Sequence, residues 1–238
     1  MTKTRRALLV LLALALLKGP LDALLANLLP DAFVDPVPQW LAGAVVSVLL
    51  LGLPAWLLRP WTSPRLVRGV SLGKGIALGV LAAAMCRFSF SPVDAAWQRL
   101  LGVVPEMLNG TEGLPVALWS MLALVVIPAV TEEAFFRGAL LTGLLDGSRR
   151  ITAVLLTMLA FAMMHGKAAN LPSLLGVSLV LTLLMLHTRC IAVSIAAHLV
   201  YNVLAFVPAR LPLWGSVLAG VALVALVEKK VVRWRGEF

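Results

Sequence analysis

Long apolar runs follow one another along almost the whole sequence, and they limit the fold to that of a polytopic membrane protein. A transmembrane helix needs about 20 consecutive, mostly apolar residues. The 238 residues are 61% hydrophobic and 13% charged, with a mean hydropathy of +0.99. A soluble domain of this length cannot bury so many apolar side chains. The sequence therefore predicts an all-α fold, a polytopic transmembrane helical bundle of about eight spans.

The apolar runs and their polar boundaries divide the chain into eight predicted spans. No repeat of fixed period is visible and no linker is long enough to separate two parts, so residues 1–238 are predicted to form a single integral membrane domain. A segment at 95–104 is predicted to be a short amphipathic helix at the membrane surface or an ordered loop. The spans are Leu8–Leu28, Trp40–Leu58, Gly75–Phe88, Leu114–Leu145, Ile151–His165, Leu171–Leu186, Cys190–Val207 and Leu211–Val227.

Basic residues are distributed unevenly between the predicted loops. The net charge is +9, and with a cytoplasmic N-terminus 14 Lys and Arg residues lie in inner loops. Only four basic residues, Arg87, Arg99, Lys167 and Arg210, lie in outer loops, together with acidic residues that include Asp94. An excess of basic residues retains loops on the cytoplasmic side of a membrane. The distribution predicts an integral protein of a bacterial inner (plasma) membrane with both termini in the cytoplasm. It also explains the positive charge without a nucleic-acid partner.

The first span has an alternative interpretation, because Lys3–Arg6 and the apolar residues after it also resemble a signal peptide. Removal of this segment would leave seven spans and the same orientation for the rest of the chain. Retention is predicted, since the apolar run resumes beyond Asp22 and no convincing cleavage site follows its core.

The fourth span contains three ionisable residues in the stretch Thr131–Arg137. A charged side chain at the centre of a membrane helix costs about 2.5–3.5 kcal/mol on insertion scales. Glu133 and Arg137 lie one helical turn apart, so they are predicted to neutralise each other. Glu132 points about 100° away from that face. We therefore expect the carboxylate of Glu132 to be available for chemistry.

Later spans carry further polar residues. His165 ends the fifth span, and His198 and Asn202 lie one turn apart on a shared face of the seventh. Counted from the cytoplasmic helix ends, these residues and Glu132 lie roughly 13–24 Å deep at the rise of an ideal helix. Four polar groups in one layer favour a functional site over isolated packed residues. His187, at a helix end, is predicted to be a solvated interfacial residue.

This set of side chains suits hydrolysis of an amide or ester. A desolvated glutamate acts as a general acid or base, and a neighbouring histidine can share a water molecule with it. A second histidine and an asparagine amide can donate hydrogen bonds to an oxyanion. Two histidines and a glutamate can also hold a zinc ion. A Ser194–His198 dyad is a minor alternative, because a serine in a membrane helix usually bonds to backbone.

Three short motifs, each on its own predicted helix, resemble those of the CPBP intramembrane proteases. This family comprises the CAAX prenyl endopeptidase and bacteriocin-processing proteases and is also called Abi. The resemblance implies an intramembrane endopeptidase, of the glutamate or metallo type, whose motif core is residues 114–207. The motifs are Glu-Glu-x-x-x-Arg from Glu132 to Arg137, Phe-x-x-x-His from Phe161 to His165, and His-x-x-x-Asn from His198 to Asn202.

The resemblance also implies roles for individual residues. Glu132 and His165 are expected to activate water, and His198 and Asn202 are expected to bind the oxyanion. Glu133 and Arg137 are then a supporting charged pair. The expected partners are the lipid bilayer and a membrane-associated protein or peptide substrate, with no nucleic acid.

Two questions have alternative answers: whether hydrolysis needs a metal ion, and whether the protein is an enzyme at all. No cofactor is favoured, because a zinc ion held by Glu132, His165 and His198 would consume the general base and leave Asn202 without a role. The sequence also indicates no second-shell acceptor that would orient His165 as a zinc ligand. A non-catalytic immunity or scaffold protein of the same fold, or a small transporter, is the alternative to an enzyme. Transporters tend to show internal repeats, which this sequence lacks.

Overall fold

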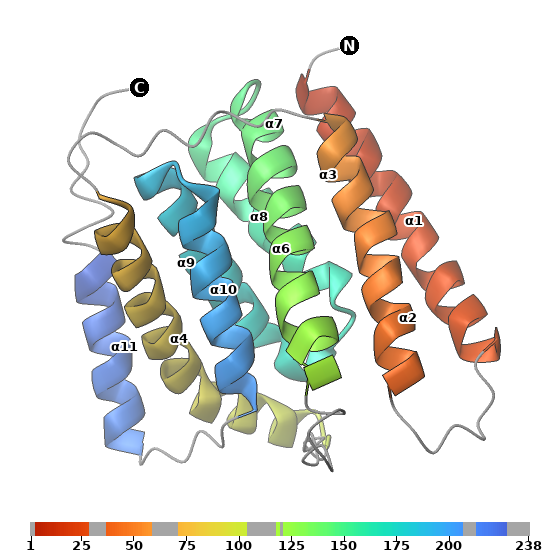
Figure 1. Ribbon diagram of the computed structural model, residues 1–238. Helices are drawn as coiled ribbons and strands as arrows, with labels where there is room; N and C mark the ends of the chain where they lie inside the picture. The colour runs from red at the N-terminus through yellow and green to blue at the C-terminus, as the bar shows by residue number, and fades with distance from the viewer. Residues whose placement is uncertain are drawn as a thin grey trace. The chain divides into compact units, whose positions relative to one another are not determined.

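The computed structural model describes residues 3–28, 37–58, 71–103, 118–119, 121–206 and 213–227 (Figure 1). Every element in these ranges is helical and none is a strand, which confirms the all-α prediction. The helices group into two units. The first comprises Met1–Trp61 and Asn109–Ala153, and the second comprises Thr62–Leu108 and Val154–Phe238.

Three helical segments lie wholly in the described part of the first unit, and two of them change between α-helical and π-helical geometry along their length. Its first helix packs against the last part of the third segment, where the Thr4 hydroxyl donates a hydrogen bond of 2.8 Å to the Gly143 carbonyl. The segments are α1, Lys3–Leu28; then α2, Val37–Ser47, with η1, Val48–Gly52, and α3, Leu53–Leu58; then η2, Met121–Val126, with α6, Ile127–Glu133, η3, Ala134–Leu141, and α7, Thr142–Leu145.

The third segment corresponds to the predicted span Leu114–Leu145. It is helical from residue 121 to residue 145, whereas 114–117 and Ser120 lie outside the described ranges. The periodicity of the sequence did not predict the π-helical turns on either side of α6. Single π-helical turns inside α-helices occur frequently at functional sites, and here one of them begins directly after Glu133.

The second unit is arranged around one long helix, α4, Leu72–Leu100, which packs against α9, α10 and α11. The two helices α4 and α10 approach closely at Gly79. A Cβ atom there would lie 3.1 Å from the Val193 carbonyl oxygen and 3.3 Å from the Ala197 Cβ. The other elements are α8, Arg150–Met164, which starts in the first unit; η4, Ala168–Asn170; α9, Leu171–Thr188; α10, Ile191–Ala205; and α11, Leu213–Val227.

Four of these helices, α8 to α11, begin and end within two residues of the predicted spans. The prediction for α4 is wrong in two respects: the helix does not end at Phe88, and 95–104 is not a separate element. Instead α4 continues through Pro92 to Leu100. A proline inside a helix removes one backbone hydrogen bond, and α9 contacts α4 two residues beyond Pro92, where the Ser173 amide bonds to Asp94. Arg87 and Asp94 therefore lie on a helix and not in an outer loop.

Three helices in the described ranges are long and apolar enough to cross a membrane. They are Leu41–Leu58, Leu72–Leu100 and Ala168–Thr188, and three shorter apolar helices are Arg150–Met164, Ile191–Ala205 and Trp214–Ala225. The chain thus has the helices of a membrane protein. The count of about eight spans stays a prediction.

Candidate active site

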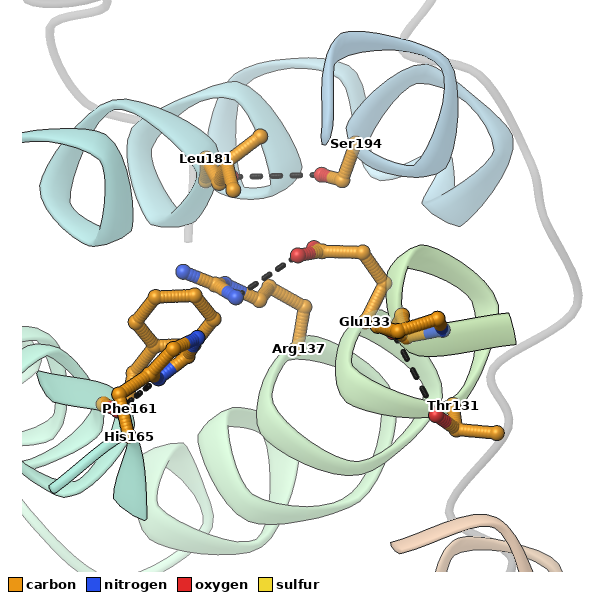
Figure 2. Close-up of polar contacts among 8 residues, drawn as sticks. Thr131, Glu133, Arg137, Phe161, His165, Leu181 and Ser194 are labelled. Carbon is orange, nitrogen blue, oxygen red and sulfur yellow. Dashed lines mark hydrogen bonds and ion pairs between the residues drawn. The ribbon is translucent and has the colours of Figure 1, made fainter. Parts of the chain in front are cut away.

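The acidic candidate residues belong to the first unit, at the junction of α6 and η3. Arg137 Nη1 donates a hydrogen bond of 2.7 Å to Glu133 Oε1, and both side chains are fully buried (Figure 2). Glu132 is half-buried and lies near enough to Arg137 to interact with its charge. The expected ion pair is therefore present. When all three residues are ionised, together they carry one net negative charge.

Neighbouring contacts hold this charged group in place. The Thr131 hydroxyl lies 2.8 Å from the Ser47 hydroxyl of α2 and 2.9 Å from the Ile127 carbonyl. The rings of Phe135 and Phe136 are fully buried and meet edge to face, with centroids 5.1 Å apart. The Arg137 guanidinium lies 6.0 Å from the Phe136 ring centroid, near the limit of a cation–π contact. The arginine is thus enclosed by a carboxylate and an aromatic ring.

The candidate histidines belong to the second unit, and His165 lies directly after α8 ends. Its backbone amide bonds to the Ala162 carbonyl, and Gly166 follows with a positive φ of 62°. Its Nδ1 lies 2.8 Å from the Phe161 carbonyl oxygen (Figure 2). A carbonyl oxygen only accepts hydrogen bonds, so Nδ1 carries the proton. In the neutral imidazole the lone pair is then on Nε2, which can accept a proton or bind a metal.

Phe161 connects the two histidines of the second unit. Its buried ring has its centroid 4.5 Å from that of His165 and 5.8 Å from that of His198. His198 is itself only 2% exposed, and Asn202 follows it by one turn on α10 and is half-buried. The structure thus brings both imidazoles to one aromatic ring. The sequence indicated the Phe-x-x-x-His motif but not this role for its first residue.

The alternative of a Ser194–His198 dyad is not supported. The Ser194 hydroxyl donates a hydrogen bond of 3.3 Å to the Leu181 carbonyl of α9 (Figure 2). A hydroxyl has a single proton to donate, and this one is used between two helices. Ser194 therefore contributes to the packing of α9 against α10.

One argument against zinc does not hold. The sequence indicated no acceptor that would orient His165, but the Phe161 carbonyl takes this position. Metal-binding histidines commonly donate their second ring N–H to such a carbonyl. The orientation of His165 thus suits a zinc ligand and a partner of water equally well.

The sequence-based prediction missed a group of polar residues on α4. Asp94 Oδ1 accepts a hydrogen bond of 3.0 Å from the Ser173 amide, and Gln98 Nε2 donates one of 3.0 Å to Asn170 Oδ1. Asp94 had been assigned to an outer loop, and Gln98 to the separate segment 95–104. The available signal was their spacing, which places them on one face of a continuous helix.

Comparison with known proteins gives a match, and its range includes both the acidic candidate residues and the candidate histidines. The model of a protein family, type II CAAX prenyl endopeptidase Rce1-like, matches residues 114–204. The matched range contains Glu132, Glu133, Arg137, His165, His198 and Asn202. No curated protein and no solved structure matches the chain. Residues 114–204 are thus similar to the type II CAAX prenyl endopeptidase Rce1-like family, in agreement with the resemblance to the CPBP proteases.

Proposed function

We propose that this chain is an intramembrane endopeptidase of the CAAX-protease type. It hydrolyses a peptide bond in a membrane-associated protein or peptide with water activated by Glu132 and His165. One observation carries the proposal: the range matched by a protease family includes every polar residue that the chemistry needs. The lipid bilayer is its medium, and the positive-inside distribution of charge supports cytoplasmic termini.

Activation of water requires a base and a second hydrogen-bond acceptor. Glu132 takes a proton from water while the oxygen attacks the carbonyl carbon of the substrate. In its neutral form His165 accepts the other hydrogen of the water through Nε2, since its Nδ1 donates to the Phe161 carbonyl. The proton on Glu132 then passes to the amide nitrogen as the C–N bond breaks. The products are a carboxylic acid and an amine.

The attack places negative charge on the carbonyl oxygen. An N–H of His198 and the side-chain amide of Asn202 are donors one turn apart on α10, a spacing suited to one oxygen. The Glu133–Arg137 pair is buried and hydrogen-bonded, and it supports the helix from which Glu132 projects. Glu133 therefore acts on stability more than on chemistry.

Zinc is a second candidate means of activating water, and the hydrogen bond of His165 Nδ1 is compatible with it, although the described residues contain no group of three His, Cys, Asp or Glu side chains placed to hold a metal ion. Glu132, His165 and His198 would hold the ion, which would lower the pKa of a bound water. The metal-free assignment gives Asn202 a role and leaves Glu132 as the base. We therefore propose it first.

The test is proteolysis in membranes that contain the full chain. Mass spectrometry of the membrane proteins, with and without the chain, is expected to reveal a fragment that depends on it. Glu132→Gln is expected to abolish this fragment while the protein still accumulates. Ser194→Ala is the matched control and is expected to retain cleavage, because Ser194 donates to a backbone carbonyl. A Glu132→Gln variant with normal turnover, or identical fragments in all samples, would refute the proposal.

A further inference from the structure

A polar stripe runs along the second half of α4 and has no part in the proposed chemistry. Arg87, Ser91, Asp94 and Gln98 are spaced by four, three and four residues, so they lie on one face of the helix. Polar side chains in a membrane-spanning helix almost always face protein or a water-filled cavity. The partners of the stripe therefore indicate what α4 does in the second unit.

Three hydrogen bonds connect side chains of α4 to the short segment 168–173. Asp94 Oδ1 accepts from the Ser173 amide at 3.0 Å, and Gln98 Nε2 donates to Asn170 Oδ1 at 3.0 Å. Beside the stripe, Trp97 Nε1 donates to the Ala168 carbonyl at 2.8 Å. All three contacts fall within residues 168–173, where η4 leads into α9. This segment begins three residues after His165.

Asp94 caps α9 from another helix. The Leu171 amide bonds to the Ala168 carbonyl, and Pro172 has no amide hydrogen, so Ser173 carries the next amide of the first turn. Asparagine commonly caps its own helix, but Asn170 makes no such bond, and its side-chain oxygen accepts from Gln98 instead. The carboxylate of Asp94 takes over the cap, where the helix dipole also favours a negative charge.

The capped segment is joined to His165 by a tight connection. The backbone amides of His165 and Gly166 bond to the carbonyls of Ala162 and Met163, at 3.3 and 3.1 Å. Gly166 adopts a positive φ, and the Asn170 amide bonds to the Lys167 carbonyl at 3.1 Å. Few backbone torsions are left to absorb a shift of 168–173. A displacement of that segment is therefore transmitted to the end of α8.

The same helix also contacts the end of α10. Arg87 Nε donates a hydrogen bond of 3.3 Å to the Leu204 carbonyl, two residues beyond Asn202. The Leu204 carbonyl lies in the last turn of α10, where the helix dipole favours a cation. One helix thus holds the chain just after His165 and just after Asn202.

We propose that α4 positions the imidazole half of the active site. Asp94, with Trp97 and Gln98, is a positioning residue for His165, and Arg87 is one for His198 and Asn202. The inference rests on the proposed function, because a positioning role needs a reaction to act upon. A misplacement of about 1 Å at a catalytic group can cost roughly 100-fold in rate. Loss of Asp94 is accordingly expected to lower kcat at least 10-fold and to leave KM nearly unchanged.

The test compares substitutions at Asp94 in the full chain, reconstituted in lipid vesicles. Asp94→Ala removes the cap, whereas Asp94→Asn keeps an oxygen that can accept from the Ser173 amide. Asp94→Ala is expected to lose kcat, and Asp94→Asn to restore most of it. Ser89→Ala is the matched control on the same helix, because the Ser89 hydroxyl bonds back to the Met85 carbonyl of α4. It is expected to behave as the wild type.

Hydrogen exchange measured by mass spectrometry separates this inference from the proposed function. In Asp94→Ala the amides of 168–173 are expected to exchange roughly 10-fold faster or more, the effect of losing one charge-assisted hydrogen bond. Unchanged exchange, or an Asp94→Ala variant with normal kcat, would overturn the positioning role even if the wild type cleaves substrate. If the wild type does not cleave substrate, the proposed function is refuted. Faster exchange of 168–173 in Asp94→Ala would then show that the contact with α4 is structural only, and the positioning role would fall with the proposed function.

A second substitution covers the case in which Asp94→Ala does not accumulate. Trp97→Phe keeps the ring packing and removes only the indole N–H that bonds to Ala168. Its kcat is expected to fall several-fold at unchanged KM, with faster exchange in the same segment. A Trp97→Phe variant with wild-type kcat and wild-type exchange would also contradict the inference.

Discussion

Substitution of Glu133 by Gln gives the sharpest test of how the two adjacent glutamates differ. Glu133 and Arg137 are fully buried and joined by a 2.7 Å bond. Removing one partner of a buried ion pair typically costs about 3–5 kcal/mol, because the other charge stays in the protein. Glu132 interacts electrostatically with Arg137, so it supplies part of the missing charge. The expected loss is therefore at the lower end, about 3 kcal/mol.

The loss translates into a measurable change in melting temperature. For chains of this size 1 kcal/mol corresponds to about 2–4 °C, so Glu133→Gln is expected to melt about 6–12 °C lower. Glu132→Gln removes the excess negative charge of the group and keeps the bonded pair, so its melting temperature is expected to equal or exceed that of the wild type. Thermal unfolding of both variants in one detergent measures the difference.

The comparison has a clear refutation. If Glu133→Gln melts like the wild type, the bonded pair does not stabilise α6 and η3 as argued. If Glu132→Gln is the less stable of the two variants, the assignment of structural and chemical roles is reversed. The Glu133→Gln, Arg137→Met double variant completes a cycle and is expected to be more stable than the sum of its single changes implies.

Four further outcomes are expected. Asn202→Ala should reduce turnover roughly 10²–10³-fold, the usual effect of losing an oxyanion donor, with little change in KM; unchanged turnover would remove Asn202 from the site. Phe161→Leu should lower kcat about 10-fold by loosening the contact between the two histidines, measured in the same assay; a change in KM alone would argue against this role. Purified protein should stay active after dialysis against a chelator, whereas stoichiometric zinc that is needed for activity would decide for a metalloprotease. A reporter active only in the periplasm should be silent after Phe238 and active when inserted near Glu112, and the reverse result would overturn the predicted orientation.

What could be predicted from the sequence was mainly local. The bounds of α8 to α11 follow from apolar runs with polar ends, and the Glu133–Arg137 bond follows from helical spacing. Both depend on residues close together in the chain. The family resemblance likewise depended on short motifs, and a family match over residues 114–204 supports it.

Long-range pairing could not be predicted. The sequence places Asp94 in an outer loop because the predicted third span ends with its apolar run at Phe88. Its partner, Ser173, lies 79 residues further along the chain, and nothing in the periodicity of α4 indicates it. The π-helical turns beside α6 could not be predicted for another reason. They depend on the hydrogen bonds of the folded backbone, and the side-chain pattern does not encode them.

The close contact at Gly79 means that substitutions at this position can change the distance between α4 and α10. There is no slack between α4 and α10 at this point, since a single added carbon would press on the Val193 carbonyl and the Ala197 methyl. Alanine, serine and valine at position 79 would act as wedges of increasing thickness. Each larger side chain would increase the distance between α4 and α10 by a further step. Turnover measured across the series would show how far the helix that carries His198 and Asn202 can move before activity is lost.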